Sequence, residues 1–308
     1  MELLMWSYDA LLGKAGAYFS RAEEHPRADG EVFALWLLLG LEFLLRAPLS
    51  KVHPTLLADP DGTAILHAAG FPAKPAQSGA KPPKDPKSIA THTVISRLGV
   101  VIDDFTKERQ EEATFLTNLR NRELHTGDAA LSLDSSVWLP RFTRVTKVVC
   151  EHLGTNPADL LGEEIVQLGQ QLVDDEDKRL DHEVRKRIEA CAATFAGLTS
   201  DVVTARRAAA RPGDKGILDH VVKCPACQSR AWPSLEAVRR TNERIESYGI
   251  YADVISIATG LACGVCSLLL NGTAEIKSAG LPQQYTHEEE ESFEARFLDT
   301  YEPEYGND

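Results

Sequence analysis

Two C-x-x-C pairs in the C-terminal third constrain this chain more than any other feature of its sequence. They are Cys224-Pro-Ala-Cys227 and Cys263-Gly-Val-Cys266, and residues 228–262 separate them. Two thiolates with two residues between them grip one side of a tetrahedral ion, and two such pairs complete a closed four-sulfur site. The four cysteines therefore predict a structural Zn²⁺ with no open position for catalysis, held in a zinc ribbon with a 35-residue insertion between its knuckles.

Two other interpretations of the cysteines fit less well. A thioredoxin-like redox site expects one C-x-x-C beside a βαβ pattern, and disulfides need an oxidising compartment. The N-terminus, Met1-Glu2-Leu3-Leu4, lacks the basic stretch and cleavage site of a secretory signal. The densest apolar run, residues 32–45, is shorter than the roughly 20 residues that cross a bilayer. We therefore expect a cytoplasmic protein with no membrane partner, in which Cys150 and Cys191 are core residues.

Apolar periodicity predicts a mainly α fold before the cysteines. Leu3, Leu4, Tyr8, Leu11 and Leu12 form one stripe, and further helical patterns follow. Together they indicate one helical bundle over residues 1–155, with helices at 1–20, 31–46, 92–105, 107–124 and 135–153.

The second half of the chain divides into three further segments. Residues 163–211 contain no proline, and their apolar positions recur every three or four residues, which predicts a long helix or stalk within 156–211. Either a dimerisation or spacer role, or folding back on the bundle, is compatible with this pattern. We expect a small zinc-ribbon domain over 212–281 and an acidic tail over 282–308.

One polar cluster in the bundle predicts chemistry, the segment Leu119-Arg120-Asn121-Arg122-Glu123-Leu124-His125. It closes a predicted helix just before Gly127. A histidine exchanges protons near neutral pH, and a guanidinium holds a phosphate and stabilises charge that develops on it. With an RNA 2′-hydroxyl as nucleophile, such a pair can cleave RNA without a metal. Helix-end arginines and histidines more often cap carbonyls or pair with carboxylates.

Arg120-Asn121-x-x-x-His125 resembles the R-x(4–6)-H motif of the HEPN superfamily, in which a polar residue often follows the arginine. The leucine-rich helix ending in Leu41-Glu42-Phe43-Leu44-Leu45-Arg46 is similar to its second helix. The resemblance implies a helical bundle that dimerises and forms a composite, metal-independent endoribonuclease site. It assigns phosphate binding to Arg120, proton transfer to His125, and positioning to Asn121, and Arg122 competes for the phosphate-binding role.

From this resemblance we expect an endoribonuclease that acts as an antiphage-defence or toxin effector. Its expected partners are an RNA substrate, a second copy of the chain and a protein of the same defence system. No catalytic metal is expected. The alternative is a non-catalytic protein that binds nucleic acid through its zinc ribbon, or an adaptor built around the long helix.

The charge distribution bears on both interpretations. The chain carries 33 Lys and Arg against 46 Asp and Glu, a net charge of −13. Residues 205–244 run against this trend, because they hold nine basic and four acidic residues, with Trp232 and Tyr248 in or near them as stacking faces. Residues 287–308 hold nine acidic residues and one arginine. We expect this end to be a solvated tail, or a polyanion mimic that covers the basic ribbon.

Overall fold

The computed structural model describes residues 6–25, 30–71, 85–213, 217 and 219–298. The chain divides into two compact units, residues 1–176 and 177–308. Helix α9 (Glu163–Ala196) belongs to the first unit as far as Glu176 and to the second unit from Asp177 onward. This division differs from the four segments that the sequence predicted, because the long helix contributes to both units.

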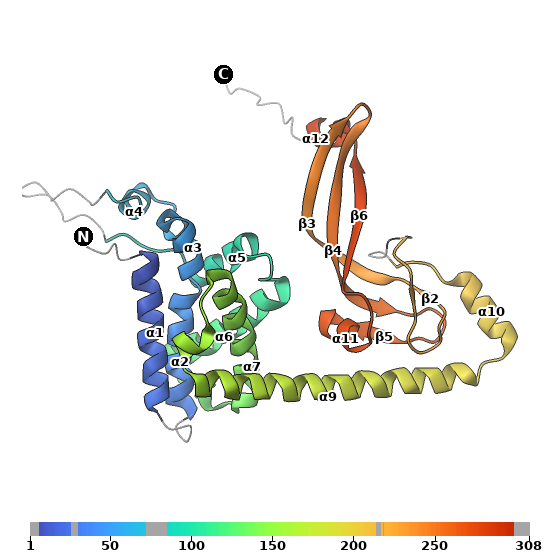
Figure 1. The fold of residues 1–308 in the computed structure, drawn as a ribbon, viewed down its shortest axis with the longest axis horizontal. Coiled ribbons are helices and arrows are strands. Elements are labelled where there is room, and N and C mark those ends of the chain that lie inside the picture. Colours follow the sequence, from blue (N-terminus) through green and yellow to red (C-terminus); the bar gives the residue numbers. More distant parts are fainter. Residues whose placement is uncertain (1–5, 26–29, 72–84, 214–216, 218, 299–308) are drawn as a thin grey trace, which may run out of the picture. The chain divides into compact units, whose positions relative to one another are not determined.

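The regular elements of unit 1 are all helices among its described residues, as predicted, apart from one isolated β-bridge between Ala58 and Ser88. Helices α1 (Tyr8–Glu24) and α2 (Gly30–Leu44) pack side by side (Figure 1). Phe19 of α1 lies against Gly40 of α2. The remaining elements are α3 (Ala47–Val52), η1 (Pro54–Leu57), α4 (Gly62–Ala68), α5 (Thr91–Val101), α6 (Lys107–His125), η2 (Ala130–Ser132), α7 (Ser135–Leu153) and α8 (Pro157–Leu161).

The core of unit 1 is apolar and continuous across these helices. Trp138, Phe142 and Phe19 form edge-on ring contacts and are buried together with the leucines of α2. Cys150 is fully buried here, as predicted, and burial raises the pKa of its thiol to about 12. Helix α7 ends at Gly154, whose left-handed conformation (φ 70°) closes the last turn.

The apolar run of α2 is longer than its sequence suggested. Helices α2 and α3 and the two turn residues between them make a 23-residue run, residues 30–52, that by length and composition could cross a membrane, the only such run among the described residues. Most of it is buried inside unit 1, since 67% of its most apolar window is covered by protein. The stretch 32–45 is itself shorter than a membrane span, whereas the helical run that contains it is not, and the burial of that run agrees with its interpretation as a core helix.

Unit 2 contains the rest of α9, helix α10 (Ser200–Ala209) and antiparallel strands. The predicted helix over 163–211 is interrupted at residues 197–199, where Gly197 and Leu198 donate to carbonyls only three residues back. The strands and last helices are β1 (Val222–Lys223), β2 (Arg230–Ala231), β3 (Pro233–Glu246), β4 (Gly249–Ala262), β5 (Leu269–Asn271), α11 (Gly272–Ser278), β6 (Gln284–Glu291) and α12 (Phe293–Leu298).

The insertion between the cysteine pairs is a long β-hairpin. Strands β3 and β4 pair from Pro233↔Leu261 to Glu246↔Gly249, and β6 pairs along the other side of β4 (Figure 1). Residues 284–291 are therefore a sheet strand and not part of a free tail, which corrects the prediction for 282–308; residues 299–308 lie outside the described residues. The sequence of β6 alternates as a strand with one covered face does, since Tyr285 and His287 are half-buried between exposed neighbours.

The seam of α9 packs on the core of the ribbon within unit 2. Val184 is buried there, and Leu180, Ile188, Cys191 and Phe195 lie against the same core. The seam residues thus cover the cysteine-containing core, a role that neither of the two interpretations left open by the sequence had included.

Candidate metal centre and candidate catalytic site

The two cysteine pairs form matching turns. In each, the residue directly after the second cysteine has a positive φ and lies two residues before a short strand; it is Gln228 (57°) in the first pair and Ser267 (63°) in the second. The same backbone bonds recur, from Gln228 N to Cys224 O and from Ser267 N to Cys263 O, both 2.9 Å. The local sequence therefore folds both pairs into knuckles of one shape.

The two knuckles bring four sulfurs together. The Sγ atoms of all four cysteines lie within 4.8 Å of one another and are buried, with 3.5 Å between Cys224 and Cys266 and 3.6 Å between Cys227 and Cys263. Four ligands about 2.3 Å from a tetrahedral zinc have sulfurs about 3.8 Å apart. The arrangement is thus that of a site that can hold a metal ion, and the four predicted ligands are the four that assemble.

The ionisation of these thiols is coupled. A hydrogen bond from Cys224 lowers the pKa of Cys263 to about 4, whereas burial raises the pKa of Cys266 to about 12. Without a cation, one thiolate is stabilised by its neighbours and further ionisation is opposed by burial and like charge. A divalent ion removes this conflict because it stabilises all four thiolates.

Helix α9 is fastened to the ribbon by one ion pair. Arg187 on α9 lies 2.7 Å from Glu275 on α11, and the same carboxylate accepts the backbone N–H of Asn271 at 2.7 Å. Burial acts to raise the pKa of Glu275, but the hydrogen bonds from Arg187 and Asn271 outweigh it and the net pKa is lowered. The pair thus links α9 to α11 and, through Asn271, to the end of β5, the strand that follows the second knuckle.

The predicted catalytic residues lie in the last two turns of α6. Arg120 points to α2, where its Nη2 lies 2.5 Å from Glu42 Oε2, and both side chains are about 15% exposed (14% and 15%). Glu42 also pairs with Arg46 and accepts a hydrogen bond from Thr91 Oγ1 at 2.6 Å. Arg120 Nε is buried and has no hydrogen-bond partner among the described residues.

Asn121 and His125 are presented differently from Arg120. His125 is exposed at the end of the helix and Asn121 is half-buried; within the described part of the chain neither forms a hydrogen bond or an ion pair. Arg122, the competing arginine, is exposed and pairs with Asp128 at 2.8 Å. The protomer thus places Arg120 in a half-buried acidic niche and His125 in solvent on the same helix end.

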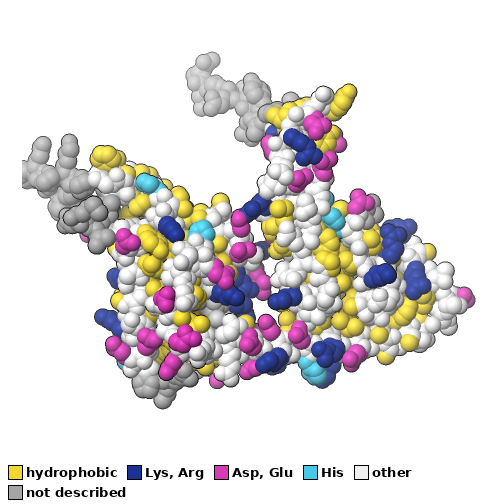
Figure 2. All heavy atoms as spheres, viewed as in Figure 1, with side chains coloured by type: hydrophobic (Ala, Val, Ile, Leu, Met, Phe, Trp, Pro, Cys, Tyr) yellow, Lys and Arg dark blue, Asp and Glu magenta, His cyan; other side chains and the backbone are white. Residues whose placement is uncertain are grey.

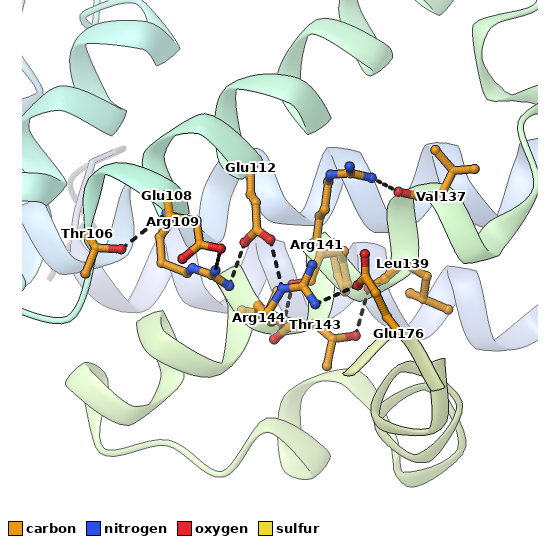
Figure 3. Close-up of polar contacts among 12 residues, drawn as sticks. Thr106, Glu108, Arg109, Glu112, Val137, Leu139, Arg141, Thr143, Arg144 and Glu176 are labelled. Atoms are coloured by element: carbon orange, nitrogen blue, oxygen red, sulfur yellow. Dashed lines mark hydrogen bonds and ion pairs between the residues drawn. The ribbon is translucent and has the colours of Figure 1, made fainter. Parts of the chain in front are cut away.

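Sequence reasoning missed a second buried charge cluster, at the other end of α6. Glu112 is 7% exposed and pairs with Arg109 at 2.7 Å and with Arg144 at 2.8 Å; Arg144 reaches on to Glu176 at 2.8 Å (Figure 3). Burial raises the pKa of Glu112 against the opposing effect of the two arginines. Its position one turn before Leu116 was the available signal, since that places a carboxylate on the apolar face of α6.

The basic stretch of residues 205–244 divides into two groups. On the hairpin, Arg240 pairs with Glu289 and Glu291 of β6, and Arg244 pairs with Glu288. Near the knuckles, by contrast, four arginines of the described chain have no carboxylate partner: Arg206, Arg207, Arg211 and Arg230. Figure 2 shows Lys and Arg side chains gathered over the region that Figure 1 labels α10 and β2.

The acidic residues of β6 therefore pair with arginines of the hairpin and not with those beside the knuckles.

Comparison of the chain with protein-family models, with curated proteins and with solved structures finds no match. The functional assignment accordingly depends on the residues and geometry of these sites.

Proposed function

We propose that the protein is a metal-independent endoribonuclease of the HEPN type, with Arg120, Asn121 and His125 as its catalytic residues and Zn²⁺ in its four-cysteine centre. The observation that carries the proposal is the niche at the end of α6. A guanidinium is held there by Glu42 with one buried donor left over, and an exposed histidine follows on the same helix end.

The chemistry requires only the RNA and these side chains. The 2′-hydroxyl attacks the adjacent phosphorus, the bond to the 5′-oxygen breaks, and the products end in a 2′,3′-cyclic phosphate and a 5′-hydroxyl. His125 accepts the proton of the 2′-hydroxyl or donates one to the leaving 5′-oxygen. Arg120 stabilises the charge on phosphorus, while Glu42 fixes the plane of the guanidinium.

One protomer supplies only one arginine and one histidine of this kind, and they differ in exposure. We therefore propose a homodimer in which the two α6 ends face each other and share a substrate phosphate. This arrangement gives the site a histidine for each side of the scissile bond. A role in the cytoplasm as an antiphage or toxin effector, with a partner protein of the same system, belongs to the same proposal.

The test is cleavage of single-stranded RNA by purified protein in buffer free of Mg²⁺, Mn²⁺ and Ca²⁺. We expect products with 2′,3′-cyclic phosphate ends from the wild type and at least about a hundredfold slower cleavage by His125→Ala, the usual range for loss of a general acid or base. The matched control is His152→Ala, an exposed histidine in the last turn of α7. Equal cleavage by His125→Ala and wild type would overturn the proposal.

Arginine variants separate the two candidate phosphate ligands. Arg120→Gln keeps hydrogen-bond donors near Glu42 but removes the charge, whereas Arg122→Gln removes the charge of the exposed arginine that pairs with Asp128. We expect Arg120→Gln to abolish cleavage and Arg122→Gln to retain most of it. The reverse result would transfer the phosphate-binding role to Arg122.

A non-catalytic, nucleic-acid-binding role is the second candidate. The observation that favours it is the pairing of Arg120 with Glu42, because a neutralised guanidinium attracts phosphate less strongly. This alternative predicts RNA affinity that depends on the zinc ribbon and no cleavage by any variant. The same cleavage assay therefore decides between the two.

A further inference from the structure

A cleft beside the knuckles gathers cationic and aromatic side chains. It has a volume of about 520 Å³, within the range that holds a small ligand. Its walls come from the C-terminal end of α10, from both knuckles and from β2, and the side chains used below are Arg207, Arg211, Ser229, Arg230 and Trp232. None of the described residues that line it is acidic.

Among the described residues, Arg207 and Arg211 of this cleft are positioned by hydrogen bonds to uncharged groups and pair with no carboxylate. Arg207 donates from Nε to Ser229 Oγ at 3.1 Å, which fixes the side chain and leaves the two terminal amino groups of its guanidinium available. Arg211 donates to the carbonyls of Ala208 and Ala210 at 2.9 and 2.8 Å, and so satisfies carbonyls at the end of α10 that would repel an anion. These two guanidinium groups are suited to an anion with several oxygens, such as a phosphate.

The aromatic part of the cleft consists of a guanidinium stacked on an indole ring. The Arg230 guanidinium lies over the Trp232 ring, 5.5 Å from its centroid, and Trp232 is half-buried, so the indole is held at the rim. Nucleic-acid bases stack on tryptophan rings and on guanidinium planes, and each base–aromatic stack contributes about 1–3 kcal/mol. Phosphate-binding and base-stacking groups thus line the same cleft.

We propose that this cleft binds one phosphorylated nucleoside, with its phosphate on Arg207 and Arg211 and its base on Trp232 and Arg230. The unit belongs either to a single-stranded RNA or to a free nucleotide, which share this chemistry. The site is distinct from the end of α6, and its occupancy requires no cleavage. Its position on the knuckles couples binding to the metal centre, because Ser229 follows the first knuckle and Val265 lies inside the second.

The test is fluorescence anisotropy with a labelled 2′-O-methyl RNA of about ten nucleotides. This probe lacks the nucleophilic hydroxyl, so binding is measured even if the protein is a ribonuclease, and failure of one proposal leaves the other intact. The variant Arg207→Gln/Arg211→Gln keeps donors for Ser229 and the α10 carbonyls while it removes two charges. We expect its affinity to fall at least about tenfold, and the slope of log K against log salt to become less negative by about 1.4.

The matched control removes two arginines of the same unit that are already neutralised. In Arg240→Gln/Arg244→Gln the charge change is identical, but both residues pair with β6 carboxylates. We expect this control to bind RNA within about twofold of wild type at moderate salt. Equal losses in the two double variants, or no loss in either, would overturn the proposal.

Two further arms examine the base and the source of the ligand. Trp232→Ala should weaken RNA binding about tenfold, and thermal unfolding of each variant confirms that unit 2 remains folded. Unlabelled AMP should displace the RNA at concentrations at which inorganic phosphate does not, and AMP that binds as tightly as the oligomer identifies a free nucleotide as the ligand. Phosphate that competes as well as AMP, or Trp232→Ala that binds RNA normally, would refute the base contact.

Discussion

The two units of this chain differ in the composition of their cores and in the partners of their arginines. Unit 1 has a continuous core of leucine, phenylalanine and tryptophan, whereas unit 2 has four cysteines among the side chains of a smaller core. In unit 1 four arginines pair with carboxylates: Arg46, Arg109, Arg120 and Arg144. Beside the knuckles, by contrast, four arginines have no carboxylate partner among the described residues: Arg206, Arg207, Arg211 and Arg230. From this difference we expect that the side-chain packing of unit 1 suffices for its stability, whereas unit 2 needs a metal ion in its four-cysteine cluster and keeps arginines that can bind an anion.

The largest effect that distinguishes the units should follow from loss of the metal centre. Structural zinc contributes about 10–16 kcal/mol to small domains, as much as the whole stability of a typical one. We expect Cys224→Ser to unfold unit 2 and to leave unit 1 helical and resistant to protease. Limited proteolysis with mass spectrometry measures this, with Cys191→Ser, a cysteine outside the four-sulfur cluster, as control. A protease-resistant unit 2 in Cys224→Ser would show that its apolar core suffices.

The tight packing of unit 1 should make one glycine sensitive to a single added methyl group. A Cβ on Gly40 would lie 2.3 Å from Cε1 of the buried Phe19 ring, so overpacking outweighs the better helix propensity of alanine. We expect Gly40→Ala to lower the free energy of unfolding by about 1–3 kcal/mol in urea titrations. Gly13→Ala in α1 is the control, because its Cβ meets nothing within 4 Å, and its stability should stay equal or rise.

The buried carboxylate of unit 1 should make its stability fall as pH rises. The folded state holds the proton of Glu112 more tightly than the unfolded state, because burial raises its pKa above 4.5. The free energy of unfolding therefore decreases as pH increases through this raised pKa. Glu112→Gln should remove the slope, by about 1 kcal/mol between pH 4 and pH 7. Identical pH profiles for variant and wild type would contradict this sign.

The carboxylate of unit 2 should show a smaller effect of opposite sign. Hydrogen bonds from Arg187 and Asn271 lower the pKa of Glu275 below 4.5, so its contribution is present above that pH and is lost as pH falls through the lowered value. Arg187 is 35% exposed, and screening keeps the effect below about 1 kcal/mol. Hydrogen exchange of α11 in Glu275→Gln should match wild type at low pH and be faster at pH 7. Faster exchange at low pH only would reverse the assignment.

The sequence predicted those parts of the fold that depend on local pattern. The apolar stripes predicted α1, α2, α5, α6 and α7, and the C-x-x-C spacing predicted which four residues form the sulfur cluster. The mainly α class holds for unit 1, and residues 1–5 of the first predicted helix lie outside the described structure.

The remaining features depend on contacts between distant segments. Glu288 to Glu291 are composed like a solvated tail, and only the pairing of β6 with β4 makes them a strand whose carboxylates meet hairpin arginines. Similarly, the contact between Glu42 and Arg120 joins residues 78 positions apart, and it depends on the packing of α6 against α2. The net charge of residues 205–244 likewise does not tell which arginines pair with carboxylates, as Arg240 and Arg244 do, and which do not, because composition carries no information about contacts.

The most direct test of RNA cleavage at the end of α6 is the mapping of RNA ends in bacteria that express the protein. We expect the wild type to produce new 2′,3′-cyclic phosphate ends and to arrest growth, and His125→Ala, made to the same level, to do neither. His152→Ala should behave as the wild type. The same RNA ends in cells that express His125→Ala would contradict a catalytic role for this histidine.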